Sequence, residues 1–178
     1  MLNPSAPAHK ERQYAKVELE RRFLMSRVPG ESVGRVGLLD RYIRGTRLRL
    51  RRQQGDDGSV FLKLSQKVPR PDGRPGLITT MYLDEAEYAA LAELPADVLR
   101  KVRLSVPPFG VDLFAGPLRG LVIGEVEFDD EAARDAFTPP PDAVTREITG
   151  DPRLVCAALA GADAGRIAAA LAAAGLTA

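Results

Sequence analysis

Apolar and polar residues alternate along much of the chain, and this two-residue period predicts β-strands. The alternation is clearest from Arg47 to Arg51, where leucine and arginine take turns. Because the predicted strands follow one another with few helices between them, we expect an antiparallel sheet and an α+β fold class. These strands cover residues 16–25, 41–53, 60–67, 77–83, 99–106, 109–114, 121–128 and 143–149.

Turn and helix signals separate the predicted strands. Residues 26–40 contain a proline and three glycines, which favours a loop or a broken connection. Residues 54–59 have the composition of a hairpin turn. Asp84 and Glu87 have the spacing of a capping box, so a helix is expected to begin there. The expected helices span residues 84–93, 130–137 and the alanine-rich end from 157, which breaks at Gly161.

Length and composition indicate one domain, since 178 residues is within the usual domain size. We expect a flexible N-terminal lead over residues 1–13, the main domain over 14–160 and a C-terminal helix over 161–178 that packs on it. The single cysteine, Cys156, excludes an internal disulfide and is expected to be a buried structural thiol. No segment approaches the roughly 20 apolar residues of a membrane span, so we expect a cytoplasmic protein without a membrane partner.

Charged residues are sorted by sign along the predicted strands. Acidic residues form two Glu-x-Glu pairs, whereas basic residues stand two apart on other strands without acidic residues between them. Charged strand faces commonly meet water, which is one interpretation. Like charges on one face repel, however, so the sorting favours a site where an anion meets the bases and a cation meets the acids. The net charge of +1 gives no reason to expect a nucleic-acid partner.

A polyphosphate with a divalent metal satisfies both requirements. Mg²⁺ and Mn²⁺ prefer oxygen ligands such as carboxylates, and Arg binds phosphate with two parallel hydrogen bonds. The candidate metal ligands are therefore Glu18, Glu20, Glu125 and Glu127. The candidate phosphate-binding residues are Arg22, Arg49, Arg51, Lys63, Lys101 and Arg103, with Arg47 and Lys67 as further candidates that could equally lie at the rim.

Several of these motifs occur in the same order as in a known family. The motifs are Glu18-Leu-Glu20-Arg-Arg22, Arg47-Leu-Arg-Leu-Arg51, Lys101-Val-Arg103, Val111-Asp112, Gly124-Glu125-Val-Glu127 and Arg146-Glu147-Ile-Thr149. Together they resemble the CYTH domain, or triphosphate tunnel metalloenzyme, family over about residues 14–160. The resemblance implies a closed eight-stranded antiparallel β-barrel, a tunnel with a polar interior that is flanked by a few helices. It also implies Mg²⁺- or Mn²⁺-dependent activity on triphosphates and, in many members, a homodimer.

The resemblance also implies roles for individual residues. It adds Glu147 to the metal site, and also Asp112, which could equally be a strand-end carboxylate without a metal role. It makes Glu18, Glu20, Lys63, Lys101 and Tyr42 the candidate catalytic residues. Two positions depart from the family pattern. Arg22 stands where the family has a lysine, and Lys63-Leu-Ser65 replaces a Thr-x-Lys segment. Arginine keeps the charge but does not readily transfer a proton.

The expected function is metal-dependent hydrolysis of a triphosphate, foremost inorganic tripolyphosphate to pyrophosphate and phosphate. One alternative is a class IV adenylyl cyclase or another nucleoside or thiamine triphosphatase, although aromatic residues, at 6% with no Trp, are scarce for base recognition. Another is a non-catalytic module that binds polyphosphate or a nucleotide, and a third is a barrel whose charges are simply solvated. The only histidine, His9, lies in the expected lead, which argues against a Ser-His-Asp nucleophile and a His-ligated zinc.

Overall fold

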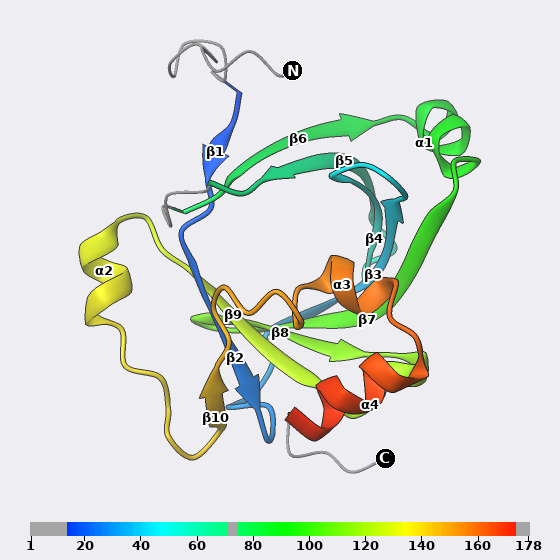
Figure 1. Ribbon diagram of the computed structural model, residues 1–178. Helices are drawn as coiled ribbons and strands as arrows, with labels where there is room; N and C mark the ends of the chain where they lie inside the picture. The colour runs from blue at the N-terminus through cyan, green and yellow to red at the C-terminus, as the bar shows by residue number, and fades with distance from the viewer. Residues whose placement is uncertain (1–13, 71–74, 174–178) are drawn as a thin grey trace.

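The computed structural model describes residues 14–70 and 75–173, and its main element is one antiparallel sheet of ten strands (Figure 1). The strands follow the order β1-β6-β5-β4-β3-β7-β8-β9-β2-β10 across the sheet. They are β1 (Lys16–Val17), β2 (Glu20–Met25), β3 (Gly34–Ile43), β4 (Leu48–Gly55), β5 (Val60–Val68), β6 (Leu77–Leu83), β7 (Ala96–Val106), β8 (Phe109–Phe114), β9 (Val122–Glu127) and β10 (Val144–Glu147). The α+β class and the antiparallel pairing are confirmed.

Short helices accompany the sheet. They are α1 (Glu85–Ala92), the 3₁₀ helix η2 (Gly116–Leu118), α2 (Glu131–Ala136), α3 (Cys156–Ala160) and α4 (Ala164–Ala173). Helices α3 and α4 lie on either side of Gly161, as the alanine-rich pattern predicts. None of the helices in the described residues is long and apolar enough to cross a membrane. The lead expected over residues 1–13 lies outside the described residues, as does the end of the expected C-terminal helix.

The segment predicted as one strand over residues 16–25 forms two strands with different partners. β1 pairs with β6, and Lys16 lies opposite Ile78. β2 pairs with β9, and Glu20 lies opposite Glu127. Only two residues separate β1 from β2, so this short stretch of chain connects one end of the sheet to the other. Figure 1 shows the sheet curving so that β5 and β6 lie across from β8 and β9.

The glycine-rich stretch is not a loop throughout. Residues 34–43 form β3, which pairs with β7 along its whole length and with β4 from Val36 to Tyr42, so the prediction of a loop over 26–40 is wrong at its end. Pairing with β7, and from Val36 onward with β4 as well, outweighs the low strand propensity of Gly34 and Gly37. The strand predicted over 41–53 is consequently divided, and Arg47 lies in the turn before β4.

Strand register places side chains on two faces of the sheet. On the outer face, Phe23, Val111 and Val126 are buried in an apolar core that includes Phe137, from the segment after α2. On another part of this face, α1 covers Leu50 and Leu64. Figure 1 shows α1 and α2 outside the curve of the sheet and α3 within it. We call the face toward α3 the inner face; it carries Arg22, Arg51, Lys101 and Arg103.

The inner face is not charged throughout. Leu24 and Ile123 lie opposite each other one step beyond the Arg22–Glu125 pair, and Phe114 lies opposite Lys101. These side chains form a buried core with Leu159 of α3 and further residues of α4 and η2. The expectation of a polar interior is therefore wrong at this end, because the C-terminal helices cover it with apolar side chains.

Helix α1 begins with the capping box that the sequence predicts. The Glu87 backbone N–H donates to Asp84 Oδ1 at 2.8 Å, and the Asp84 N–H donates to Glu87 Oε2 at 2.9 Å. Replacing Asp84 with alanine is expected to lower the free energy of unfolding by about 1 kcal/mol, because the Glu87 backbone N–H loses its side-chain acceptor. Urea unfolding measures this. The control Glu85→Ala, in the same turn, should change it by less than about 0.5 kcal/mol, and equal losses in both variants would contradict the prediction.

Candidate functional site

The charged residues predicted from the strands gather on the inner face. Arg22 lies opposite Glu125, and Arg103 lies opposite Asp112. Arg51 lies opposite Lys63 on one side and opposite an aspartate, Asp40, on the other. A cavity of about 730 Å³ opens beside this face, and its lining includes Gln53, Phe61, Arg103, Glu125 and Glu127. The alternation in the sequence therefore identified which side chains share a face, although most of them are paired with one another.

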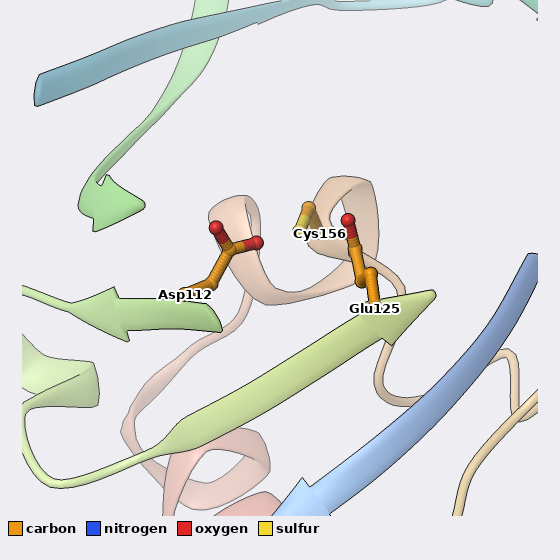
Figure 2. Close-up of side chains that lie close together, drawn as sticks. All are labelled: Asp112, Glu125 and Cys156. Carbon is orange, nitrogen blue, oxygen red and sulfur yellow. The ribbon is translucent and has the colours of Figure 1, made fainter. Parts of the chain in front are cut away.

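Asp112, Glu125 and Cys156 point toward one another from β8, β9 and α3 (Figure 2). Their oxygen and sulfur atoms lie within 4.8 Å of one another, and within the described part of the chain they form the only such trio of potential metal ligands. Cys156 is half-buried, and its Sγ lies 3.5 Å from Lys101 Nζ. The thiol thus borders the charged face as well as the apolar core of the C-terminal helices.

Cations from neighbouring strands already neutralise this trio. Arg103 binds both oxygens of Asp112 at 2.7 Å and also contacts Glu125. Lys101 contacts Asp112, and Arg22 Nε donates to Glu125 Oε1 at 3.1 Å. Burial alone would raise the pKa of Glu125, but the charges of Arg103, Lys101 and Arg22 more than offset it and hold the pKa well below its usual range. These contacts make the trio part of an ion-pair network.

Asp40 belongs to the site, and the sequence reasoning missed it. It is fully buried, and Arg51 binds its two oxygens at 2.6 and 2.7 Å. Burial would raise the pKa of Asp40, but the hydrogen bonds and charge of Arg51 outweigh it and hold the pKa below its usual value. Asp40 and Tyr42 stand two apart on β3, which is the signal that could have placed Asp40 on the charged face.

The four glutamates predicted as metal ligands divide into two kinds. Glu125 is paired as described, and Glu18 accepts a contact from Lys67 at 2.6 Å. Glu20 and Glu127 lie directly opposite each other, and neither makes an ion pair within residues 14–70 and 75–173. Burial raises the pKa of Glu20, the nearby Glu125 raises it further, and the partial offsets from Lys67 and Arg22 do not cancel these effects. Two adjacent carboxylates are thus left without a cation in the described structure.

On the other side of the inner face, two bases have no acidic partner among the described residues. Arg49 on β4 has a buried Nε atom without a hydrogen-bond partner. Lys63 on β5 donates only to the amide oxygen of Gln53, at 3.3 Å. Burial lowers the pKa of Lys63, and the charges of Arg51 and Arg49 lower it further. This part of the face therefore has an excess of positive charge.

Two of the candidate catalytic residues are held in their protonated forms. Burial raises the pKa of Tyr42 well above its usual value, and Cys156 and Asp40 add to the rise. Burial would lower the pKa of Lys101, but Cys156, Asp112 and Glu125 more than offset it and raise the pKa. Both groups can therefore donate hydrogen bonds near neutral pH, and neither is suited to accept a proton.

Three predicted residues lie apart from the rest. Glu147 on β10 lies opposite Phe23, on the outer face, where Arg21 binds it at 2.7 and 3.0 Å. The structure does not bring it together with the other predicted metal ligands. Arg47 is exposed in the turn before β4, and Lys67 is exposed at the end of β5 beside Glu18. These last two positions agree with the alternative that both are rim charges.

Comparison with known proteins places this arrangement in a family. No family model matches the chain. Over 155 residues, however, it is 33% identical to an inorganic triphosphatase of Nitrosomonas europaea, and the match covers 80% of this chain and 96% of that protein. The chain belongs to this inorganic triphosphatase family. This relative confirms the part of the sequence resemblance that concerns triphosphatases.

Solved structures agree with the family assignment. A crystal structure of the inorganic triphosphatase NE1496 is similar to the structure described above, with a TM-score of 0.56 and 29% sequence identity. The match covers 83% of this chain and 97% of NE1496. A second crystal structure of NE1496, described as a hypothetical protein, gives a TM-score of 0.55 at 30% identity and covers 82% and 98%. The triphosphatase-like fold thus extends over most of the described residues.

Proposed function

We propose that this protein is a metal-dependent enzyme of the CYTH, or triphosphate tunnel metalloenzyme, type that hydrolyses inorganic tripolyphosphate to pyrophosphate and phosphate. One observation carries the proposal, namely the separation of unneutralised charge across the inner face. Among residues 14–70 and 75–173, Glu20 and Glu127 lack cations on one side, and Arg49 and Lys63 lack carboxylates on the other. A triphosphate with a bound metal ion supplies both missing charges. The relative's activity on inorganic triphosphate supports the same substrate class.

We propose that the reaction takes place inside a closed β-barrel. β1 and β2 together act as one interrupted strand that reaches β6 at one end of the sheet and β9 at the other. If this strand is counted once and the short β10 is left out, the number of strands is eight. The inner face would then enclose the charged side chains, and the apolar core around Leu159 would close one end. These features support a tunnel that is entered from the cavity beside Arg103.

The residues of the inner face fit Mg²⁺ or Mn²⁺. Carboxylate oxygens are the ligands that these hard ions prefer. Glu20 and Glu127 would hold the ion, because they have no competing cation in the described structure and burial raises the pKa of Glu20. Glu18, between β1 and β2, is bound to Lys67, and Glu125, on β9 with Glu127, is bound to Arg22. When bound, the ion would supply Lewis-acid neutralisation of phosphate charge.

The remaining residues of the inner face would position the triphosphate. Arg103 lines the cavity, and Arg51 and Arg49 extend the positive surface along β4. Phosphoryl transfer depends mainly on positioning and charge neutralisation, which fixed guanidinium groups provide without rearrangement. Tyr42 and Lys101, held protonated, would donate hydrogen bonds to phosphate oxygens. Of the two lysines proposed as catalytic, only Lys63 has the lowered pKa that favours proton transfer.

A colorimetric assay for phosphate released from tripolyphosphate, with Mg²⁺ or Mn²⁺, tests the proposal. Replacing Glu20 with glutamine is expected to weaken apparent metal binding about tenfold or more, because removing a direct ligand should cost at least as much as removing a residue that only orients one, about 10–100-fold. Because the pKa of Glu20 is raised, protons compete with the metal for this carboxylate at pH values above the usual pKa range of Glu. Wild-type metal affinity should therefore fall as the pH is lowered toward that raised pKa, and this loss should be smaller in Glu20→Gln.

A carboxylate outside the site provides the control. Glu131, on α2, is mostly exposed. Phosphate release by Glu131→Gln should depend on metal concentration as it does in the wild type. No phosphate release with either ion would refute the proposed activity. If Glu20→Gln and Glu127→Gln reach full activity at the same metal concentrations as the wild type, the assigned metal ligands are refuted.

The alternatives predict different products. A class IV adenylyl cyclase would form cyclic AMP from ATP, and a thiamine triphosphatase would prefer that substrate over tripolyphosphate. A non-catalytic module would bind triphosphate without releasing phosphate. The homodimer and the cytoplasmic location stay predictions.

A further inference from the structure

A second cavity lies among the helices that end the described part of the chain. Its volume is about 440 Å³, and its walls come from the segment before α3, from α3 and from α4. The walls are mainly leucine and alanine, including Leu154, Ala158 and Leu159. Pockets for small molecules commonly have this size and such apolar walls, with a few polar or charged groups that orient the ligand. The cavity therefore fits the apolar part of a small molecule.

Two arginines also line this cavity. Arg153 binds both oxygens of Asp151, at 2.7 and 2.9 Å, so an acidic partner already offsets its charge. Within the described part of the chain, the Arg166 side chain makes neither an ion pair nor a hydrogen bond, while its backbone N–H donates to Asp163 Oδ1 at 2.8 Å. A guanidinium group binds a carboxylate with two parallel hydrogen bonds. One unpaired guanidinium beside apolar walls thus favours a singly charged carboxylate with an aliphatic chain.

The walls of this cavity also contact the charged inner face. Leu154, which lines the cavity, accepts a hydrogen bond on its backbone oxygen from Arg22 Nη2 at 3.1 Å. Helix α3 places Leu159 at the cavity and Cys156 Sγ at 3.5 Å from Lys101 Nζ. Arg22 and Lys101 are both candidate phosphate-binding residues. A molecule that packs against Leu154 and Leu159 would therefore hold in place the segment that contacts both bases.

We propose that the cavity between α3 and α4 binds a small aliphatic carboxylate, and that this binding tightens the binding of triphosphate on the inner face. The aliphatic chain packs against Leu154, Leu159 and the alanines, and the carboxylate binds Arg166. A ligand that stabilises one arrangement of α3 raises affinity at the other site, and the effect is reciprocal. The regulatory part of this inference rests on the proposed triphosphatase function, whereas the carboxylate site itself does not.

Calorimetric titration of the full chain with octanoate tests the carboxylate site without triphosphate. Arg166→Gln should weaken octanoate binding about tenfold, the usual effect of losing a charged hydrogen-bond partner. Acetate, which lacks the chain, and octanol, which lacks the charge, should each bind at least about tenfold more weakly than octanoate. Ala158→Phe, which fills the cavity, should abolish binding in protein that circular dichroism shows to be folded. The control Arg27→Gln changes an exposed arginine that does not line the cavity, and octanoate affinity should stay within about twofold.

Imidotriphosphate with Mg²⁺ tests the regulatory part, because this analogue binds without turnover. Saturating octanoate should tighten imidotriphosphate binding about fivefold, the lower end of the usual range of coupling between sites. Imidotriphosphate should tighten octanoate binding by the same factor. In Arg166→Gln, imidotriphosphate binding without octanoate should stay within about twofold of the wild type, and the octanoate concentration that gives half of the tightening should rise about tenfold.

The two proposals can fail separately. Failure of octanoate to bind the wild type, or equal binding to Arg166→Gln, would overturn the carboxylate site. Binding that requires deletion of residues 174–178 would overturn it too, because the end of the chain would then be the occupant. Octanoate binding that leaves imidotriphosphate affinity unchanged would overturn the regulation. Protein that binds octanoate through Arg166, but neither binds imidotriphosphate nor releases phosphate, would refute the proposed function and the regulation and leave the carboxylate site standing.

Discussion

Replacing Arg103 with methionine is expected to lower kcat/KM for tripolyphosphate about 100- to 1,000-fold, the typical effect of removing one fixed donor to a transition-state oxyanion. Arg103 links the two halves of the site. Its Nε and Nη2 atoms hold Asp112 and Glu125, which leaves Nη1 available to a phosphate oxygen in the cavity that this side chain lines. Two carboxylates fix the guanidinium in place before substrate arrives, so little reorganisation opposes binding.

Three further measurements make this prediction specific. Arg103→Lys keeps the charge but not the planar fork, and it should recover only part of the lost activity. Arg44→Met removes an exposed pair, Arg44 with Asp97 at 2.7 Å, and activity should stay within about twofold. Circular dichroism melts show whether Arg103→Met remains folded, since the variant leaves Asp112 with Lys101 as its cation. Activity of folded Arg103→Met within fivefold of the wild type would contradict the assigned role.

The sorting of charges onto one face could be predicted from the sequence because a strand repeats every two residues. Arg49 and Arg51 share a face whatever they pair with, and the same holds for Glu125 and Glu127. The pairing itself could not be predicted. Glu18 is bound to Lys67, whereas Glu20, two residues on, faces Glu127, because β1 and β2 have different neighbours in the sheet. Which carboxylates lack an ion-pair partner in the described structure thus depends on strand order, which the local sequence pattern does not contain.

The apolar end of the inner face is a second feature that the local sequence pattern could not predict. Leu24, Leu99 and Ile123 each stand two residues from a charged residue and share its face of the sheet. Nothing local to these strands shows that a helix from the end of the chain packs on them. The contact with Leu159 joins segments far apart in the sequence, so the apolar closure of one end became visible only in the folded structure.

The aspartate that the sequence reasoning missed is expected to have the largest effect on stability. Asp40→Ala should lower the free energy of unfolding by about 3–5 kcal/mol, the usual result of removing one partner from a buried ion pair. Asp40 is fully buried, and the Arg51 side chain is only 11% exposed, so the freed guanidinium has little access to water. Asp142, mostly exposed and paired with Arg27, provides the control. Asp142→Ala should lose less than about 1 kcal/mol in urea unfolding.

The pH dependence of the unfolding free energy distinguishes the charge of the Asp40–Arg51 ion pair from the packing of the Asp40 side chain. The pKa of Asp40 in the folded protein is below its unfolded value of about 3.9. Its ionic contribution to stability is therefore complete above that pH and is lost as the pH falls toward the folded pKa, because the unfolded chain takes up the proton first. Asp40→Asn fills the same space and does not titrate. The difference in unfolding free energy between the wild type and Asp40→Asn should stay constant from about pH 7 to pH 5 and narrow below about pH 4. A difference that stays constant at acid pH would show that Asp40 contributes shape and hydrogen bonds, and that its charge is not what stabilises β3 against β4.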